Sequence, residues 1–352
     1  NGQESGVAMH DVTTDEPTMR AAWLHEPAPI DRRPLEWQDR PAPEPGHGEV
    51  LVEVTACGVC RTDLQLCEGD LTPRHLPIVP GHQVVGRVRR LGDGVDGIAV
   101  GDRVGIAWIA GTCGRCRFCT TGRENLCEQA TFTGWDRDGG YAELVVADAA
   151  FVHPLPHGYD DVAAAPLLCG GAIGYRCLEA AGAAPGQRLG LYGFGASATI
   201  VVQLAKHLGC EPYVVTRSKH EQARALRLGA VWAGSYDERP PVPLDAAITF
   251  APVGSVVVDA LAAVDRGGVV VVNAIHLDHI PELDYGLLWW ERSVRSVANV
   301  TRRDVRRLLE LAPQVPIVTE VDTYRLDEAN DALLALREGR VHGAAVLLAG
   351  SG

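Results

Sequence analysis

The fold of this chain is decided by one segment, RLGLYGFGASATIVVQLAKHLG at residues 188–209. It begins as an apolar strand and ends with apolar residues at helical spacing. Between the two lies a Gly-x-Gly turn, which lets the backbone approach a pyrophosphate at the positive N-terminus of the helix. A tight turn without a ligand is the alternative, but the strand–turn–helix context favours a dinucleotide site. Its predicted residues are Gly193, Phe194, Gly195, Ala196 and Ser197, with Ala198 as the third small residue.

The same alternation continues after this segment. Apolar strands (PYVVT, LDAAITF, GGVVVVNA) alternate with helical stretches (KHEQARALRLG, GSVVVDALAAV), as in a parallel sheet. Before about residue 170, short strands are separated by Gly and Pro, for example GEVLVEVTACG and GDRVGIAW. Two further helices and two strands follow residue 299. We therefore predict an α/β protein whose pattern changes near residues 170 and 298.

Composition excludes several classes of function. The net charge of −13 argues against nucleic-acid binding. No apolar run reaches the roughly eighteen residues of a membrane span. Residues 1–18 are polar and acidic, so we expect a disordered extension rather than a signal peptide. Ten cysteines without a secretion signal indicate a reducing, cytoplasmic location, where clustered thiols more often bind metal than form disulfides.

Four cysteines are crowded into residues 111–127, GTCGRCRFCTTGRENLC. Their spacing suits four thiolates that close tetrahedrally on one Zn²⁺ and leave no open position. Such a site is structural. Free or redox-active thiols are the alternative, which the spacing disfavours. The predicted ligands are Cys113, Cys116, Cys119 and Cys127.

A catalytic zinc needs three protein ligands and an open fourth position. Candidates lie in C57-G-V-C60-R-T-D63, in P80-G-H82-Q83 and in L168-C169-G-G. Each is weak alone, because a single His is usually a hydrogen-bonded core residue and a single Cys a small buried hydrophobe. We assign no role to Cys67, Cys177 or Cys210.

Together with the four cysteines and the glycine turn, these segments resemble the zinc-containing alcohol dehydrogenases of the medium-chain dehydrogenase/reductase family, from about residue 20 to 350. The resemblance implies a GroES-like β-rich catalytic domain at 19–170 plus 299–352 carrying two zincs, an inserted Rossmann domain at 171–298 and an active site between them. It also implies that Cys60, His82 and Cys169 hold the catalytic zinc. Cys57 is then a neighbour of the zinc site at the end of a strand and not a ligand. A thioredoxin-type Cys57–Cys60 pair is the rival interpretation, and it lacks the usual helix start after it.

The resemblance also implies roles for three neighbours of Cys60. Thr62 would relay the alcohol proton, Asp63 would orient a ligand imidazole, and Arg61 would reach the cofactor pyrophosphate. A surface ion pair is the alternative for Arg61 and Asp63. Two positions depart from the family: Gln65 replaces a common His of the proton relay, and Gln83 replaces the usual Glu after the ligand His.

Cofactor preference is predicted from the end of the strand PYVVT. A site for NAD(H) places an acidic residue there to bind the ribose 2′-hydroxyl. This chain instead has Thr216, Arg217 and Ser218, which suit a 2′-phosphate. The alternative is a solvated helix start with Ser218 as N-cap. We predict that NADP(H) is preferred and that NAD(H) is possible.

The predicted activity is reversible oxidation of a primary alcohol, or reduction of an aldehyde, in a homodimer or homotetramer. Leu71 stands where yeast-type ethanol enzymes of the family have a Trp, and Trp108 and Ile109 are expected to line the same pocket, with core packing as their alternative. Medium-chain or aromatic substrates should therefore exceed ethanol. The alternatives are a zinc oxidoreductase for a polyol, formaldehyde or a ketone, and a non-catalytic zinc-ribbon binding protein.

Overall fold

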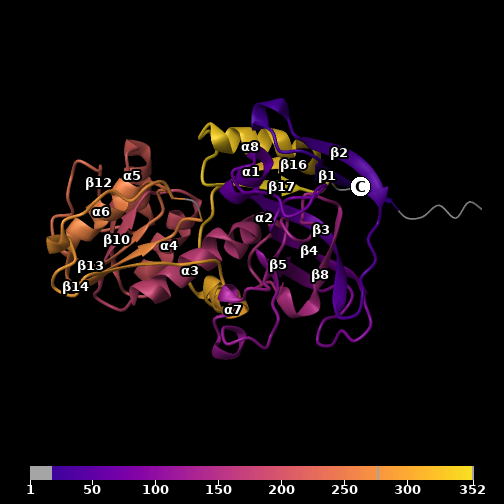
Figure 1. Cartoon of the computed structure of the whole chain (residues 1–352), viewed down its shortest axis with the longest axis horizontal. Helices are drawn as coiled ribbons and strands as arrows, with labels where there is room; N and C mark the ends of the chain where they lie inside the picture. Colours follow the sequence, from indigo (N-terminus) through magenta and orange to yellow (C-terminus); the bar gives the residue numbers. More distant parts are fainter. Residues whose placement is uncertain (1–17, 276, 351–352) are drawn as a thin grey trace, which may run out of the picture.

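The computed structural model describes residues 18–275 and 277–350, which form two lobes (Figure 1). The predicted disordered extension therefore lies outside the described residues, except for Thr18, which begins the first strand. Among the described helices, none has the length and apolar character needed to cross a bilayer.

The β-rich lobe contains a hairpin, β1 (Thr18–Leu24) with β2 (Leu35–Pro41), and a seven-stranded sheet. The sheet runs in the order β16, β17, β3, β4, β5, β9, and β8 pairs with β3. Its strands are β3 (Glu49–Val59), β4 (Gln83–Leu91), β5 (Arg103–Ile106), β8 (Leu144–Asp148), β9 (Val152–Pro154), β16 (Val321–Arg325) and β17 (Ala344–Leu348). Because β17 pairs antiparallel with β3, opposite ends of the chain share one sheet. A short ribbon, β6 (Ile109–Gly111) with β7 (Thr131–Phe132), lies beside it.

Four of the described α-helices lie before residue 170 or after residue 299 of the chain. They are α1 (Arg61–Glu68), α2 (Asp161–Ala164), α7 (Arg302–Leu311) and α8 (Ala329–Arg337). Helix α7 begins with a capping box between Thr301 and Asp304, the S/T-x-x-D/E type of helix start. The predicted helices after residue 299 are therefore present.

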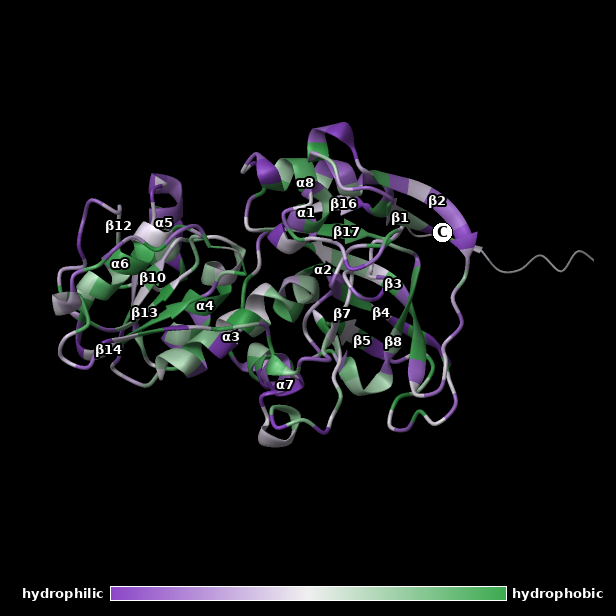
Figure 2. Ribbon diagram, in the orientation of Figure 1, coloured by the Kyte–Doolittle hydropathy of each residue, from purple (hydrophilic) through white to green (hydrophobic). Residues whose placement is uncertain are grey.

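The second lobe holds a six-stranded parallel sheet in the order β12, β11, β10, β13, β14, β15. Numbered along the chain this is 3-2-1-4-5-6, the doubly wound order of dinucleotide-binding folds. The strands are β10 (Arg188–Tyr192), β11 (Glu211–Val215), β12 (Trp232–Gly234), β13 (Leu244–Thr249), β14 (Val264–Val272) and β15 (Ser293–Ser296), and the helices are α4 (Ala196–His207), α5 (Lys219–Leu228) and α6 (Gly254–Ala263). Ligands bind such sheets where the strand order reverses, here between β10 and β13. Figure 2 shows the apolar strands of this sheet enclosed by helices.

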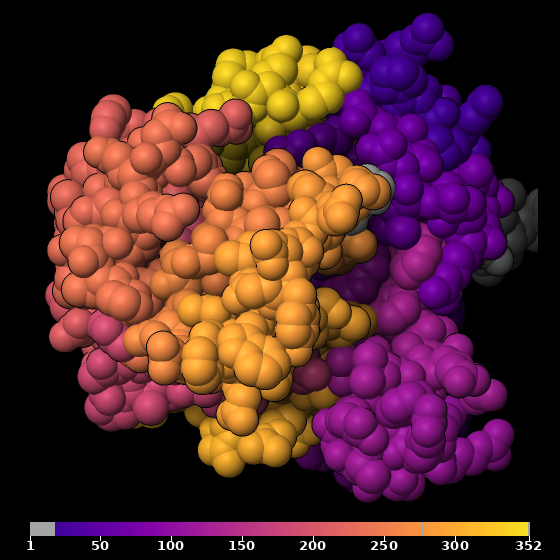
Figure 3. Space-filling view, turned by 60° about the vertical axis from the view of Figure 1, so that its left-hand side comes forward, coloured from indigo at the N-terminus to yellow at the C-terminus, as the bar shows by residue number. Residues whose placement is uncertain are grey.

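Helix α3 (Gly170–Ala181) was not predicted from the sequence, because glycines at 170, 171 and 174 are poor helix formers. The structure explains one of them. A Cβ at Gly174 would lie 2.4 Å from Val201 on α4, so glycine permits close packing of the two helices. The edge strand β15 was also not predicted. Figure 3 shows a hollow between the two lobes, with the orange surface of the inserted sheet on one side.

Candidate active site

Three side chains from distant elements meet in what we call the three-residue cluster: Cys60, His82 and Cys169. Cys60 is the N-cap of α1, His82 directly precedes β4, and Cys169 is the N-cap of α3. The two sulfur atoms lie 3.9 Å apart, and His82 Nε2 lies 3.3 Å from Cys169 Sγ. Thiolates around tetrahedral zinc, with Zn–S near 2.3 Å, stand about 3.8 Å apart. The donor set and its spacing therefore fit Zn²⁺ with a fourth position free.

Asp63 fixes the orientation of His82. Its Oδ1 lies 3.0 Å from His82 Nδ1 and accepts a hydrogen bond from Gly81 N, while Oδ2 accepts one from Cys60 N. Both side chains are almost fully buried. Burial lowers the pKa of His82, but the Asp63 carboxylate and Cys60 outweigh it and raise that pKa to about 10. With Nδ1–H donated to Asp63, Nε2 is the ring nitrogen that faces the cluster, and it would bind a metal ion on releasing its proton.

The structure corrects one argument about Cys57. Helix α1 begins directly after Cys60. The statement that a Cys57–Cys60 pair lacks the usual helix start after it is therefore wrong. The pair is disfavoured for another reason. Cys57 is fully buried, its Sγ lies 3.8 Å from the carbonyl oxygen of Gly58, and burial raises the pKa of its thiol well above normal. Cys60 instead contacts Cys169.

The neighbours of the cluster occupy different environments. Thr62 Oγ1 lies 3.7 Å from Cys60 Sγ and is buried, whereas Arg61 is exposed on the first turn of α1. Gln83 is buried, and its side chain fills the space beside Gly58, where a Cβ would come within 2.8 Å of its Oε1. An uncharged amide therefore stands where the family usually has a carboxylate.

The four remaining predicted metal ligands form a separate group, the cysteine lobe (residues 111–129). Their sulfur atoms all lie within 4.8 Å of one another, with Cys116 and Cys119 3.5 Å apart. Backbone N–H groups of Arg115 and Cys116 point at Cys113 and lower the pKa of its thiol to about 6. Four sulfur donors leave no open position, so this donor set fits a structural zinc.

The cysteine lobe is attached to the segment that leads from β15 into α7. Glu124, almost fully buried, accepts hydrogen bonds from the backbone and guanidinium of Arg302 at 2.6–3.1 Å. Asn125 Nδ2 donates to the carbonyl of Ala298 at 2.7 Å. The lobe therefore holds the point where the chain returns from the inserted sheet.

Next to this contact, His153 is buried, and burial together with Arg306 and Arg302 lowers its pKa from 6.5 to about 4. In the unfolded chain His153 binds a proton near pH 6.5, whereas in the folded chain it binds one only near pH 4. Stability from this site is complete above pH 6.5 and is lost as the pH falls. Between pH 7 and pH 5, His153 should lower the free energy of unfolding by about 2 kcal/mol. Urea unfolding of H153L, which shares every other titrating group, should show a smaller loss; an equal loss would contradict the assignment.

The predicted dinucleotide turn lies at the carboxyl end of β10, at the reversal of strand order. Gly193 has a φ of 91°, which disfavours other residues, and the space around a Cβ at Gly195 is empty to 4 Å. Helix α4 starts there without a side-chain cap. A Cβ at Gly170 would lie 3.0 Å from Ser197 Oγ, so the turn lies next to the segment that begins with Cys169.

The end of β11 carries no acidic residue. Thr216 is buried and its N–H bonds to Gly234, whereas Arg217 is exposed and makes no hydrogen bond or ion pair with the rest of the described chain. Ser218 caps α5 through the N–H of Glu221, as the alternative interpretation required. Glu221 is engaged with Arg224. Thr216, Arg217 and Ser218 thus supply no carboxylate to a ribose, and the nearby Glu238 accepts the N–H of Ser235 at 2.7 Å.

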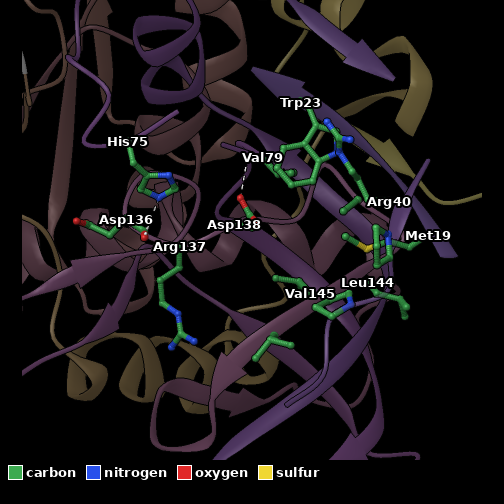
Figure 4. A pocket seen from close by; sticks show the side chains of 15 residues that line it. Met19, Trp23, Arg40, His75, Val79, Asp136, Arg137, Asp138, Leu144 and Val145 are labelled. Carbon is green, nitrogen blue, oxygen red and sulfur yellow. Dashed lines mark hydrogen bonds between the residues drawn. The ribbon is translucent and has the colours of Figure 1, made fainter. Parts of the chain in front are cut away.

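The residues predicted to line the substrate pocket differ in burial. Ile109 has no exposed surface and belongs to the core, whereas Trp108 and Leu71 are partly exposed. A pocket of about 460 Å³ is lined by Met19 and Trp23 of β1, by Val79 and by residues 136–139 (Figure 4). Asp138 in its wall accepts a hydrogen bond from Val79 N at 3.0 Å. None of the three-residue cluster lines this pocket, and we assign it no role in the reaction.

Comparison with known proteins agrees with this geometry. Residues 46–157 match the alcohol dehydrogenase GroES-like domain family. A probable alcohol dehydrogenase of Mycobacterium tuberculosis is 50% identical over 94% of this chain and 97% of its own length. An alcohol dehydrogenase of Geobacillus stearothermophilus is 35% identical over 94% and 98%. Among solved structures, a cinnamyl alcohol dehydrogenase of Sorghum bicolor superimposes with a TM-score of 0.85 at 26% identity, covering 94% of this chain and 97% of that one. The chain therefore belongs to the alcohol dehydrogenases of the medium-chain dehydrogenase/reductase family.

Proposed function

We propose that this alcohol dehydrogenase depends on a catalytic zinc at Cys60, His82 and Cys169 and prefers NADP(H). The three-residue cluster carries the proposal, because it offers two sulfurs and an oriented imidazole beside a glycine turn suited to a dinucleotide. A second zinc belongs to the cysteine lobe. The proposed division is a catalytic domain at 19–170 plus 299–352 and a cofactor domain at 171–298. All ten cysteines are free thiols, which supports a reducing, cytoplasmic location.

The chain's own residues prepare the site for hydride transfer. A zinc ion held there supplies Lewis acidity that stabilises negative charge on the oxygen of an alcohol. Asp63 keeps His82 in the tautomer that binds metal, and the buried Thr62 hydroxyl is positioned beside Cys60 to accept the proton of the alcohol and pass it outward. Gln65 follows where a histidine is common; an amide passes a hydrogen bond but stores no proton near neutral pH. Arg61, Gly193 to Ser197, and Arg217 with its neighbours would hold the cofactor.

Substrate size provides the test of this function. With Leu71 in place of an indole, hexan-1-ol or benzyl alcohol should show a kcat/KM about tenfold or more above that of ethanol, because each added methylene that finds room is worth about 1–3 kcal/mol. Steady-state assays with NADP⁺ measure this, and L71W should reduce the ratio. A higher kcat/KM for ethanol would contradict the pocket. Activity with a polyol, formaldehyde or a ketone alone would favour those alternatives, and no turnover would favour the binding protein.

The partner that we propose is a second copy of this chain. Within the described residues, β15 pairs only with β14, so its outer edge is open. Large apolar side chains lie just before it: Tyr285, Trp289 and Trp290 are 67%, 52% and 49% exposed. An open strand edge beside an apolar patch favours pairing with another strand. Light scattering should give the mass of two or four chains. The W289S/W290S variant should be smaller, and an unchanged mass would place the interface elsewhere.

A further inference from the structure

Three aromatic rings form a wall next to His82. We define this aromatic cluster as Trp108, Phe132 and Trp135. Their ring centroids are 5.3–5.9 Å apart and their planes lie within 16–28° of parallel. Trp108 meets the His82 ring edge-on at 4.7 Å. The cluster therefore begins at one of the three proposed zinc ligands and extends away from it.

Hydrogen bonds hold the cluster rigid. Thr133 joins the two segments that carry the rings, since its N–H and hydroxyl donate to the carbonyls of Trp108 and Ala107, both at 2.9 Å. The Trp135 indole N–H donates to Thr72 O at 3.0 Å. All three rings are only partly buried, so ring surface remains open after these contacts. A preorganised apolar surface loses little conformational freedom when a ligand binds.

The outer end of the cluster is closed by Arg74. Its guanidinium lies 4.0 Å from the centroid of the Trp135 ring and pairs with Asp136 at 2.6 Å. Asp136 in turn accepts the N–H of Phe132 at 2.9 Å. Arg74 thus directs one guanidinium nitrogen to Asp136 and lies over the Trp135 ring. The recognition surface that remains is aromatic.

We propose that the aromatic cluster selects alcohols and aldehydes that carry a planar aromatic ring over saturated ones of equal size. This inference rests on the proposed function and narrows it. Aromatic rings gain attraction from offset or edge-on contact beyond the area they bury, and a puckered cyclohexyl ring gains none of it. Area burial alone would favour cyclohexyl, which is at least as apolar. A preference for phenyl therefore reports ring contact and not hydrophobicity.

The test compares 3-phenylpropan-1-ol with 3-cyclohexylpropan-1-ol, whose reacting carbons are alike because the ring is remote. In the zinc-loaded wild-type enzyme with saturating cofactor, kcat/KM should be about tenfold higher for the phenyl compound. W108L and W135L should bring the ratio to about one or below, and because the ratio compares two substrates in the same variant, a general change of rate does not alter it. W37L, which removes an indole from the β1–β2 hairpin, should keep the wild-type ratio.

Binding of non-reacting amides separates this inference from the proposed function. Benzamide should bind the holoenzyme about tenfold more tightly than cyclohexanecarboxamide, and W108L should remove the difference. A wild-type ratio near one, with both alcohols oxidised, overturns the aromatic selection and leaves the dehydrogenase intact. No turnover of any alcohol overturns the proposed function, and the amide ratio still decides whether the rings select aromatic ligands.

Discussion

Alcohol oxidation should fall by at least about 10³-fold when Cys169 is replaced by serine, while the fold persists. Serine is a poor ligand for zinc near neutral pH, and His82 with Cys60 would be left as an incomplete donor set. The metal content should drop from two zincs per chain to one, and the melting temperature should change little because Cys169 only begins α3. Metal analysis, circular dichroism and steady-state rates on the same preparation measure all three.

Cys113→Ser should show the opposite pattern, because it opens the closed sulfur set of the cysteine lobe. The melting temperature or solubility should fall. C210S is the matched control, since Cys210 lies outside both groups and its Sγ approaches the carbonyl of Ala184 at 3.4 Å, a contact that a serine hydroxyl can keep. One zinc in fully active wild-type protein would contradict the assignment of two zincs per chain, and none would contradict both sites.

Loss of the Arg217 guanidinium should raise the KM for NADPH by about 10- to 100-fold and leave that for NADH nearly unchanged. Arg217 is exposed at the end of β11 and has no partner elsewhere in the described residues, so its charge is available to a 2′-phosphate. A charge-assisted bidentate contact of this kind contributes about 1.5–3 kcal/mol. The measurement is kcat/KM with each cofactor for R217A.

The matched control is R227A, which removes one positive charge from an exposed position at the end of α5. It should change neither KM. T216D should shift preference toward NADH, because it restores the carboxylate that a ribose 2′-hydroxyl requires. Equal or better kcat/KM with NADH in the wild-type enzyme would show that the end of β11 has been misinterpreted.

The sequence predicted the features that arise from residues close together in the chain. The alternation of apolar strands and helices after residue 188 indicated the parallel sheet, and the four clustered cysteines indicated one compact donor set. The sequence could not reveal α3, because the glycine that weakens it as a helix is required by Val201 on the neighbouring helix. It also could not reveal the Glu124–Arg302 contact or the aromatic cluster, since these join residues far apart in the chain or in unrelated loops. Contacts of that kind leave no periodicity to detect.

The pairing of β17 with β3 sets the order in which this chain matures during synthesis. The six-stranded sheet is built from one contiguous stretch, residues 188–296, and has all its strands once that stretch has left the ribosome. The other sheet is completed later, because residues 344–348 are translated after this stretch and residues 56–59 of β3 keep an open edge until β17 is made. Cys60 follows directly on β3, so its thiol lies on a sheet that is complete only after β17 has been translated. A nascent chain would thus carry all strands of the six-stranded sheet while the seven-stranded sheet is still incomplete.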